Sequence, residues 1–288
     1  MTDKVFVELG RRPEEDGKLA RPDARAAYPQ DVRKRLDAEA NEIVARYPGS
    51  RSALLPLLHL VQSEDACITP AGIDFCSDTL NLTGAEVAAV ATFYSMYRRE
   101  PTGDYLVGVC TNALCAVMGG DAIFGALTDH LDVGNGGTTP DHKVTLEHIE
   151  CNAACDYAPV VMVNWEFYDN QTPESARTLV DSLRAGSPVD PTRGAPLCSF
   201  RETSKILAGF PDRRPNASEA AGNAGPATLS GLRVAAERSM SAPTVPERPT
   251  PPTSDSADRA AAEEVREEKP APAPAADVPS KNAAGEGD

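Results

Sequence analysis

The sequence predicts an α/β protein, in which a small helical bundle is followed by a domain of alternating strands and helices and then by a disordered tail. Apolar residues recur at helical spacing between residues 29 and 100. From residue 101 to 210, short apolar runs typical of strands alternate with helical patterns. The 78 residues after Phe210 contain no Phe, Tyr or Trp and hold 12 of the 25 prolines, so they cannot form a core.

Charge and composition restrict the function. The formal net charge is −15, and an acidic chain argues against nucleic-acid binding. No apolar stretch reaches eighteen residues, and the N-terminus lacks the pattern of a signal peptide, so we expect a cytoplasmic protein without direct membrane insertion. In a reducing compartment, the seven cysteines indicate metal binding rather than disulfides.

The helical bundle follows a polar lead-in, residues 1–28, that prolines and glycines break into an irregular segment. Four helices are expected, beginning near Asp31, Leu54, Pro70 and Thr83. Pro56 is compatible with the second helix only in its first turn, where backbone donors lack partners. Thr83 and Glu86 have the spacing of a capping box, which marks the start of the fourth helix.

The second domain contains two helices and four strands. The strands are expected at Tyr105–Val109, Val144–Ile149, Val160–Val163 and Trp165–Tyr168; one helix follows Gly120, and the other runs from Thr172 to Gly186. The order strand, helix, strand, strand, strand, helix is that of a thioredoxin-like sandwich. Its first crossover is right-handed, so the first two strands should be parallel neighbours.

Two cysteine pairs follow these parallel strands. Cys110 and Cys115 enclose four residues, whereas Cys151 and Cys155 enclose three. Zinc ribbons and redox dithiols usually have two residues inside each pair, so the wider spacing favours a [2Fe–2S] cluster with these four cysteines as ligands. Two alternatives remain: a structural zinc site in a non-redox assembly module, and a dithiol–disulfide oxidoreductase.

The remaining candidate residues have simpler interpretations. Cys67, Cys76 and Cys198 are interpreted as core or loop residues. His148 would suggest a Rieske site only with a second histidine beside a cysteine pair, so it is interpreted as a surface strand residue. Gly134–Gly137 lacks the context of a dinucleotide fingerprint, and we therefore expect no flavin or NADH site in this chain.

Five segments of the sequence match a known family: Ser52–Gln62, Ala91–Met96, Val109–Cys115, Glu150–Cys155 and Pro196–Phe200. In residues 30–210 the chain resembles the thioredoxin-like [2Fe–2S] subunit of respiratory complex I, the NADH:quinone oxidoreductase. The resemblance implies that Cys110, Cys115, Cys151 and Cys155 ligate one [2Fe–2S] cluster. It also places Ala158-Pro159 where thioredoxin-like folds have a cis proline.

The resemblance further implies an electron-transfer role without a complete active site in this chain. The partner would be the subunit that carries FMN and the NADH site, together with other iron–sulfur subunits of the peripheral arm of complex I. That arm lies on the cytoplasmic face of the cell membrane. Related subunits serve NAD-linked hydrogenases and formate dehydrogenases, so the identity of the complex stays open.

Two surface segments are further candidates for contact with partners. The second helix and the Phe93-Tyr94 region are expected to dock on the flavin subunit. In the tail, Ser230–Arg238 contains a small apolar cluster. It is either part of an inert disordered extension or a short helix that folds onto a partner.

Overall fold

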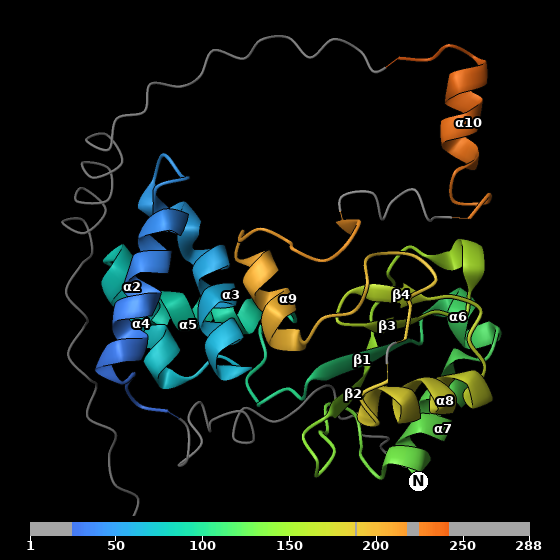
Figure 1. The fold of residues 1–288 in the computed structure, drawn as a ribbon, viewed down its shortest axis with the longest axis horizontal. Helices are drawn as coiled ribbons and strands as arrows, with labels where there is room; N and C mark the ends of the chain where they lie inside the picture. The colour runs from blue at the N-terminus through green and yellow to red at the C-terminus, as the bar shows by residue number, and fades with distance from the viewer. Residues whose placement is uncertain (1–24, 188, 218–224, 242–288) are drawn as a thin grey trace, which may run out of the picture. The chain divides into compact units, whose positions relative to one another are not determined.

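The computed structural model describes residues 25–187, 189–217 and 225–241 (Figure 1). Most of the predicted irregular lead-in lies outside these residues, and residues 25–29 are irregular as expected. Of the predicted disordered tail, residues 218–224 and 242–288 also lie outside them. Within the tail, Ser230–Glu237 forms the short helix α10, whereas disorder was expected for this segment. The docking of this helix on a partner stays a prediction.

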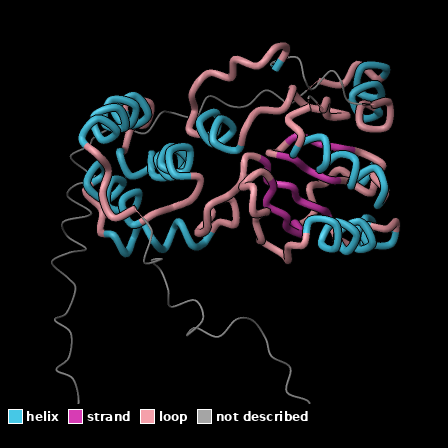
Figure 2. Tube along the Cα trace, turned by 60° about the horizontal axis from the view of Figure 1, so that its bottom comes forward, coloured by secondary structure: helices cyan, strands magenta, loops and turns pink. Residues whose placement is uncertain are grey.

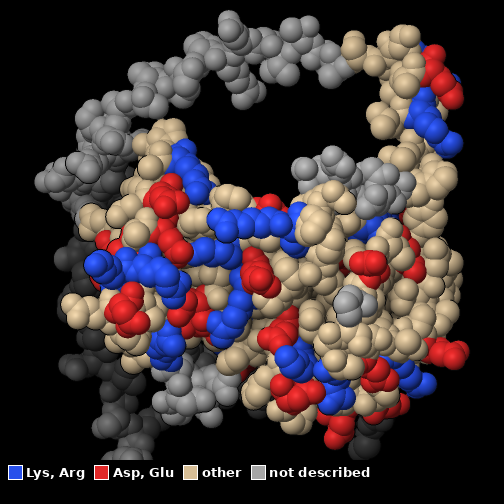
Figure 3. All heavy atoms as spheres, viewed as in Figure 1, with Lys and Arg blue, Asp and Glu red and all other residues tan. Residues whose placement is uncertain are grey.

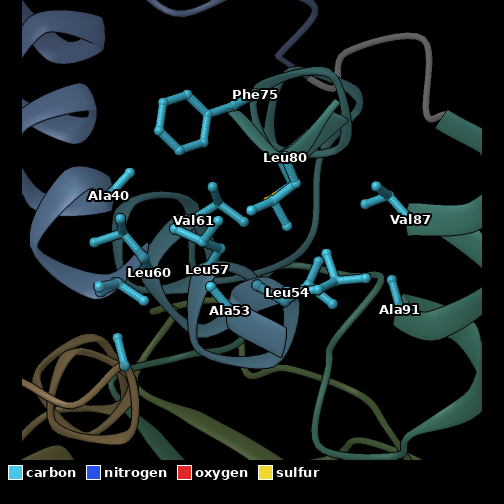
Figure 4. Packing of buried hydrophobic residues seen from close by; sticks show 14 of the residues in the cluster. Ala40, Ala53, Leu54, Leu57, Leu60, Val61, Phe75, Leu80, Val87 and Ala91 are labelled. Atoms are coloured by element: carbon cyan, nitrogen blue, oxygen red, sulfur yellow. The ribbon is translucent and has the colours of Figure 1, made fainter. Parts of the chain in front are cut away.

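The helical bundle is built around one helix that is buried on almost all sides. Its elements are α2 (Gln30–Val44), η1 (Ser50–Ala53), α3 (Leu54–Asp65), α4 (Pro70–Leu80) and α5 (Gly84–Phe93). In the centre, Leu57 and Val61 of α3 are fully buried and pack with residues of the surrounding helices, including Phe75 and Val87 (Figure 4). This packing accounts for the continuous apolar sequence of α3.

The first turns of α3 and α5 have the features that the sequence predicted. Pro56 lies in the first turn of α3, as predicted, where its missing N–H breaks no helical hydrogen bond. At the start of α5, the Thr83 side chain accepts from the Glu86 backbone, and the Glu86 side chain accepts from the Thr83 backbone. The predicted capping box is therefore confirmed.

Within the described residues, four strands form one mixed sheet in the order β2-β1-β3-β4. The strands are β1 (Tyr105–Cys110), β2 (Val144–Ile149), β3 (Val161–Val163) and β4 (Glu166–Tyr168). As predicted, β1 and β2 are parallel, whereas β3 pairs antiparallel with both β1 and β4. Trp165, expected in the last strand, instead shares the hairpin turn with Asn164, and both residues have positive φ.

Two helices pack on one face of this sheet. Helix α7 (Gly120–Leu131) follows β1, and α8 (Pro173–Arg184) follows β4; they pack against each other and against the sheet (Figure 2). Ile123 and Leu127 of α7 and Val180 of α8 are buried against Val107 and Val144. Both predicted helices thus turn an apolar side to the sheet.

Helix α9 (Phe200–Leu207) follows the sheet in sequence but packs on α3 of the bundle. The sequence pattern did not predict it, although Ser199 and Glu202 form a capping box at its start. Between the two helices, the fully buried Gln62 side chain donates to Ser204 Oγ at 3.5 Å and to the Met96 carbonyl at 3.1 Å. The chain therefore returns to the bundle after completing the sheet.

Charged side chains of both signs are interspersed over the face seen in Figure 3. Several form ion pairs on the helices, among them Arg35–Glu64 at 2.7 Å and Arg51–Glu86 at 2.9 Å. Among the described residues, no helix has the length and apolar character needed to cross a membrane.

The central position of α3 can be tested by a matched pair of substitutions. Leu57→Ala should lower the free energy of unfolding by about 2–5 kcal/mol, because it opens a cavity in a fully buried site. Leu55→Ala, in the same helix at 38% exposure, should cost no more than about 1 kcal/mol. Urea unfolding monitored by circular dichroism measures both values, and equal losses would contradict the packing described.

His59 of α3 should make the folded protein sensitive to acid. His59 is 6% exposed, its ring centre lies 5.0 Å from that of Tyr97, and burial lowers its pKa to about 4. Because an unfolded chain binds the proton first, the stability from neutral His59 is present above pH 6.5 and is lost as pH falls towards 4. The loss should approach about 3 kcal/mol.

Unfolding free energies measured between pH 6.5 and 4 test this sensitivity. His59→Gln carries no titrating group and should lose less stability over that window than the wild type. Identical pH slopes for the two proteins would rule out His59 as the cause.

Candidate metal centre

The register of the two parallel strands brings the predicted ligand segments to one edge of the sheet. Cys110, the last residue of β1, pairs with Ile149, the last residue of β2. Cys151 follows Ile149 by two residues. Because both strands run in the same direction, both ligand segments leave the sheet at its carboxyl edge, as the sequence predicted.

The first cysteine pair is buried. Cys115 lies in a short helix, α6 (Ala113–Val117), which was not predicted from the sequence. Cys110 and Cys115 are each 3% exposed and pack with Ala158 and Ile149. The two sulfurs are thus shielded from solvent by the sheet edge.

Gly120, the first residue of α7, lies against the backbone of Cys110 and Cys115. A Cβ atom at Gly120 would overlap the backbone oxygen of Cys110 and would come within 2.9 Å of the backbone oxygen of Cys115. Only glycine therefore permits this close approach of the helix start to the two cysteines. Sequence reasoning identified the helix start but not this constraint.

The second pair is exposed and sits in an irregular loop. Cys151 and Cys155 are both exposed, with their sulfurs 4.0 Å apart, and Cys155 begins the 3-10 turn η2 (Cys155–Tyr157). The Ala153 N–H donates to Cys151 Sγ at 3.4 Å, as expected for loop donors around an anionic centre. Among the residues described, the buried Asn152 Nδ2 has no hydrogen-bond partner and remains an available donor in the same loop.

The four thiols influence one another. The pKa of Cys115 is raised to about 11, chiefly by burial and also by the Cys110 and Cys155 thiols, whereas a backbone hydrogen bond at Val160 lowers it. The pKa of Cys155 is raised chiefly by Cys151 and also by Cys110. Negative charge on one pair therefore opposes ionisation of the other pair, and a bound cation would favour the thiolates.

The number and type of donors suit a [2Fe–2S] cluster. Within the described residues, no three or more His, Cys, Asp or Glu side chains are grouped tightly enough to hold one metal ion. The cysteines instead form two pairs, and the irons of a [2Fe–2S] cluster together take four thiolates. Backbone and side-chain donors are present in the loop beside them.

The other candidate residues lie away from this edge or have structural roles. Cys76 is fully buried in the helical bundle, where burial raises its pKa to about 12, and Cys67 is 5% exposed. The Cys198 sulfur lies 3.2 Å from Thr203 Oγ1. His148 is an exposed residue of β2, with its ring edge-on to Phe124.

Two further segments near the cysteine pairs, Ala158-Pro159 and Gly134–Gly137, were interpreted from the sequence. The Ala158-Pro159 peptide bond is cis, as predicted for this position. Gly134–Gly137 forms a turn against β2, in which Gly136 N–H donates to the Leu146 carbonyl at 2.7 Å, rather than a strand-to-helix loop. Sequence reasoning missed Arg193, whose guanidinium contacts Ala154 and Asp156 on either side of Cys155.

A family model described as thioredoxin-like [2Fe-2S] ferredoxin matches residues 40–184, which include all four cysteines. The chain belongs to this family. The E subunit of the Mycobacterium tuberculosis NADH-quinone oxidoreductase is 65% identical over 242 residues, covering 84% of this chain and 95% of that protein. NADH-quinone oxidoreductase subunit 2 of Thermus thermophilus is 38% identical over 148 residues, covering 50% of this chain and 82% of that protein.

Among solved structures, an air-oxidised NAD+-reducing [NiFe]-hydrogenase is 23% identical, with a TM-score of 0.42, and the match covers 47% of this chain and 23% of that chain. A likeness this weak decides nothing about the complex. Membership of the ferredoxin family does establish the cofactor class, which is one [2Fe–2S] cluster, and the thioredoxin-like fold predicted from the strand order.

The close approach at Gly120 can be tested within one helix. Gly120→Ala should lower both the iron retained per chain and the thermal unfolding temperature, because the backbones of Cys110 and Cys115 must move to admit the methyl group. Gly125→Ala, in the same helix with open space around it, should keep the iron content, and it should gain up to about 1 kcal/mol of helix stability. Equal iron contents in the two variants would contradict the constraint.

Proposed function

We propose that this chain is the electron-transfer subunit of an NADH:quinone oxidoreductase, with one [2Fe–2S] cluster held by Cys110, Cys115, Cys151 and Cys155. The observation that carries the proposal is the 65% identity to the mycobacterial NADH-quinone oxidoreductase chain over 84% of this protein. A likeness of that extent includes much of the C-terminal part beyond residue 184, where the family model ends. The function is therefore supported by nearly the whole chain rather than by the cysteines alone.

Each ligand pair has its own role in this proposal. Cys110 and Cys115 hold one side of the centre out of water, which lowers the local dielectric constant and strengthens hydrogen bonds to the sulfurs. Cys151 and Cys155 lie on the exposed loop, where electrons can reach a partner. The cluster supplies reversible uptake of one electron, and the Ala153 N–H stabilises negative charge on Cys151 Sγ.

The proposed partner is the subunit that carries FMN and the NADH site, alongside other iron–sulfur subunits of the same complex. Helix α3 was expected to dock on this partner, but most of its leucines pack inside the bundle. Leu57 and Leu58, for example, are fully buried. Phe93 and Tyr94, at 78% and 40% exposure, remain available at the end of α5. Through this partner the chain would be held at the cytoplasmic face of the cell membrane.

Analysis of anaerobically purified protein tests the ligand assignment. The wild type should contain two irons and two sulfides per chain and should give the EPR signal of a reduced [2Fe–2S] cluster after dithionite. Cys110→Ser and Cys151→Ser should each lose most of the iron or change the g-values, since each removes one thiolate.

Cys198→Ser is the matched control, because its sulfur contacts Thr203 rather than the other cysteines. It should keep the wild-type iron content and spectrum. Zinc in place of iron, or unchanged spectra in both ligand variants, would refute the proposal. Co-purification of a flavin subunit with NADH:quinone activity tests the choice of complex.

A further inference from the structure

Arg193 lies outside the region matched by the family model, yet it is held firmly beside the sheet. Its side chain is only 13% exposed. The Phe167 N–H of β4 donates to the Arg193 carbonyl at 3.3 Å, and the neighbouring Thr192 N–H donates to the Phe167 carbonyl at 2.9 Å. These bonds extend the sheet beyond β4 and fix the backbone position of the arginine.

The guanidinium reaches both residues that flank Cys155. Nη2 donates to the Ala154 carbonyl at 3.3 Å, and Nη1 donates to both carboxylate oxygens of Asp156 at 3.2 Å. A further bond from Nη2 to Asp169 Oδ1, at 2.7 Å, anchors the group to the segment after β4. One planar cation therefore ties the residues before and after Cys155 to the sheet.

Aromatic rings enclose the same guanidinium. Its carbon lies 5.7 Å from the centre of the Tyr157 ring and 5.3 Å from that of Phe167. Tyr157 closes the 3-10 turn that begins at Cys155. The arginine thus contacts every residue of the ligand loop from Ala154 to Tyr157 except Cys155 itself.

A segment of the C-terminal region, Gly225–Thr228, covers this arrangement; we call it the strap. Ala227 N–H donates to the Tyr157 hydroxyl at 3.2 Å. Thr228 Oγ1 donates to Asp156 and accepts from Arg193 Nη1 at 3.2 Å. At Gly225 the backbone passes so close to Tyr157 that a Cβ atom would overlap the tyrosine hydroxyl.

We propose that Arg193 is a positioning residue for the cluster ligand Cys155, and that the strap locks Arg193 and Asp156 onto the ligand loop. This inference rests on the proposed function, because it concerns one of the four proposed ligands. Cys155 is exposed and belongs to no strand, so the sheet register that places Cys110 does not extend to it. Arg193 supplies the missing constraint, and its positive charge offsets the Asp156 carboxylate beside an anionic cluster.

The first test replaces the arginine in the full-length protein with its cluster loaded. Arg193→Met should speed iron release to a ferrous-iron chelator by about 10-fold or more, the usual effect of removing a group that orients a metal ligand. Arg193→Lys should recover part of the loss, because an ammonium can pair with Asp156 or Asp169 but cannot span them and the Ala154 carbonyl together.

The matched control is Arg214→Met. Arg214 is equally buried, with its side chain 16% exposed, and its hydrogen bonds go to Asp212, Glu166 and Pro196. Its loss should lower the thermal unfolding temperature without accelerating iron release. Equal acceleration in both arginine variants would show a general loss of stability and would overturn the positioning role.

The second test changes residues of the strap and leaves Arg193 in place. Gly225→Ala should push the strap off Tyr157 and speed iron release, whereas Gly231→Ala, with open space around it in α10, should not. Thr228→Val, which keeps the shape but removes the hydroxyl between Asp156 and Arg193, should act in the same direction. Identical release rates in the two glycine variants would refute the strap.

The g-values of the reduced cluster provide a readout that general instability does not move. They should shift in Arg193→Met and Gly225→Ala and stay at the wild-type values in both controls. Should Arg193→Met fail to fold, Gly225→Ala and Thr228→Val decide the outcome. A wild type without a [2Fe–2S] signal would refute the proposed function, whereas a wild-type signal with unchanged strap and arginine variants would refute only this inference.

Discussion

The parallel pairing of β1 with β2 is the constraint on which the rest of the site depends. In parallel strands, residues that end the two strands leave the sheet at one edge, and the register pairs Cys110 with Ile149. A shift by one residue would turn Cys110 to the opposite face and bury it among the residues that pack on α7. Val107 and Val144, packed beneath α7 and α8, hold the register in place, so the hydrophobic core fixes the position of the metal centre.

The buried side chain of Asn164 connects the β3–β4 hairpin with chain segments that precede and follow it in the sequence. Asn164, at the β3–β4 turn, is 1% exposed, and its Oδ1 accepts from the Leu106 N–H at 2.8 Å. Its Nδ2 donates to the carbonyls of Asp104 and Cys198, both at 2.9 Å. Three segments that are distant in sequence thus share one amide side chain, which satisfies backbone groups that the short strands leave unpaired.

Features that arise from local spacing could be predicted from the sequence. The start of α4, the bounds of β2 and the capping box at Thr83 follow from neighbouring residues. The exit of both cysteine segments at one edge of the sheet follows from the handedness of one crossover. Features that arise from contacts between distant residues could not be predicted. Arg193 meets Ala154 across 39 positions in the sequence, and nothing near Arg193 marks it as part of the site.

The difference in solvent exposure between the two cysteine pairs could not be predicted from the sequence either. Both pairs begin at or just after the end of a strand, yet Cys110 is 3% exposed and Cys151 is exposed. Burial depends on α6 and on the segment around Ala158, which cover the first pair only. Helix α9 was missed for a different reason, since it has just eight residues, too few for a clear helical repeat, although the Ser199–Glu202 capping box marks its start.

The return of α9 to α3 also affects how the chain matures during translation. Gln62 and Ser204, 142 positions apart, meet inside the bundle. Helices α2 to α5 leave the ribosome first, but their packing is completed only after the whole sheet has been synthesised. Until then, α9 cannot cover its side of α3, and the Gln62 side chain lacks its Ser204 partner.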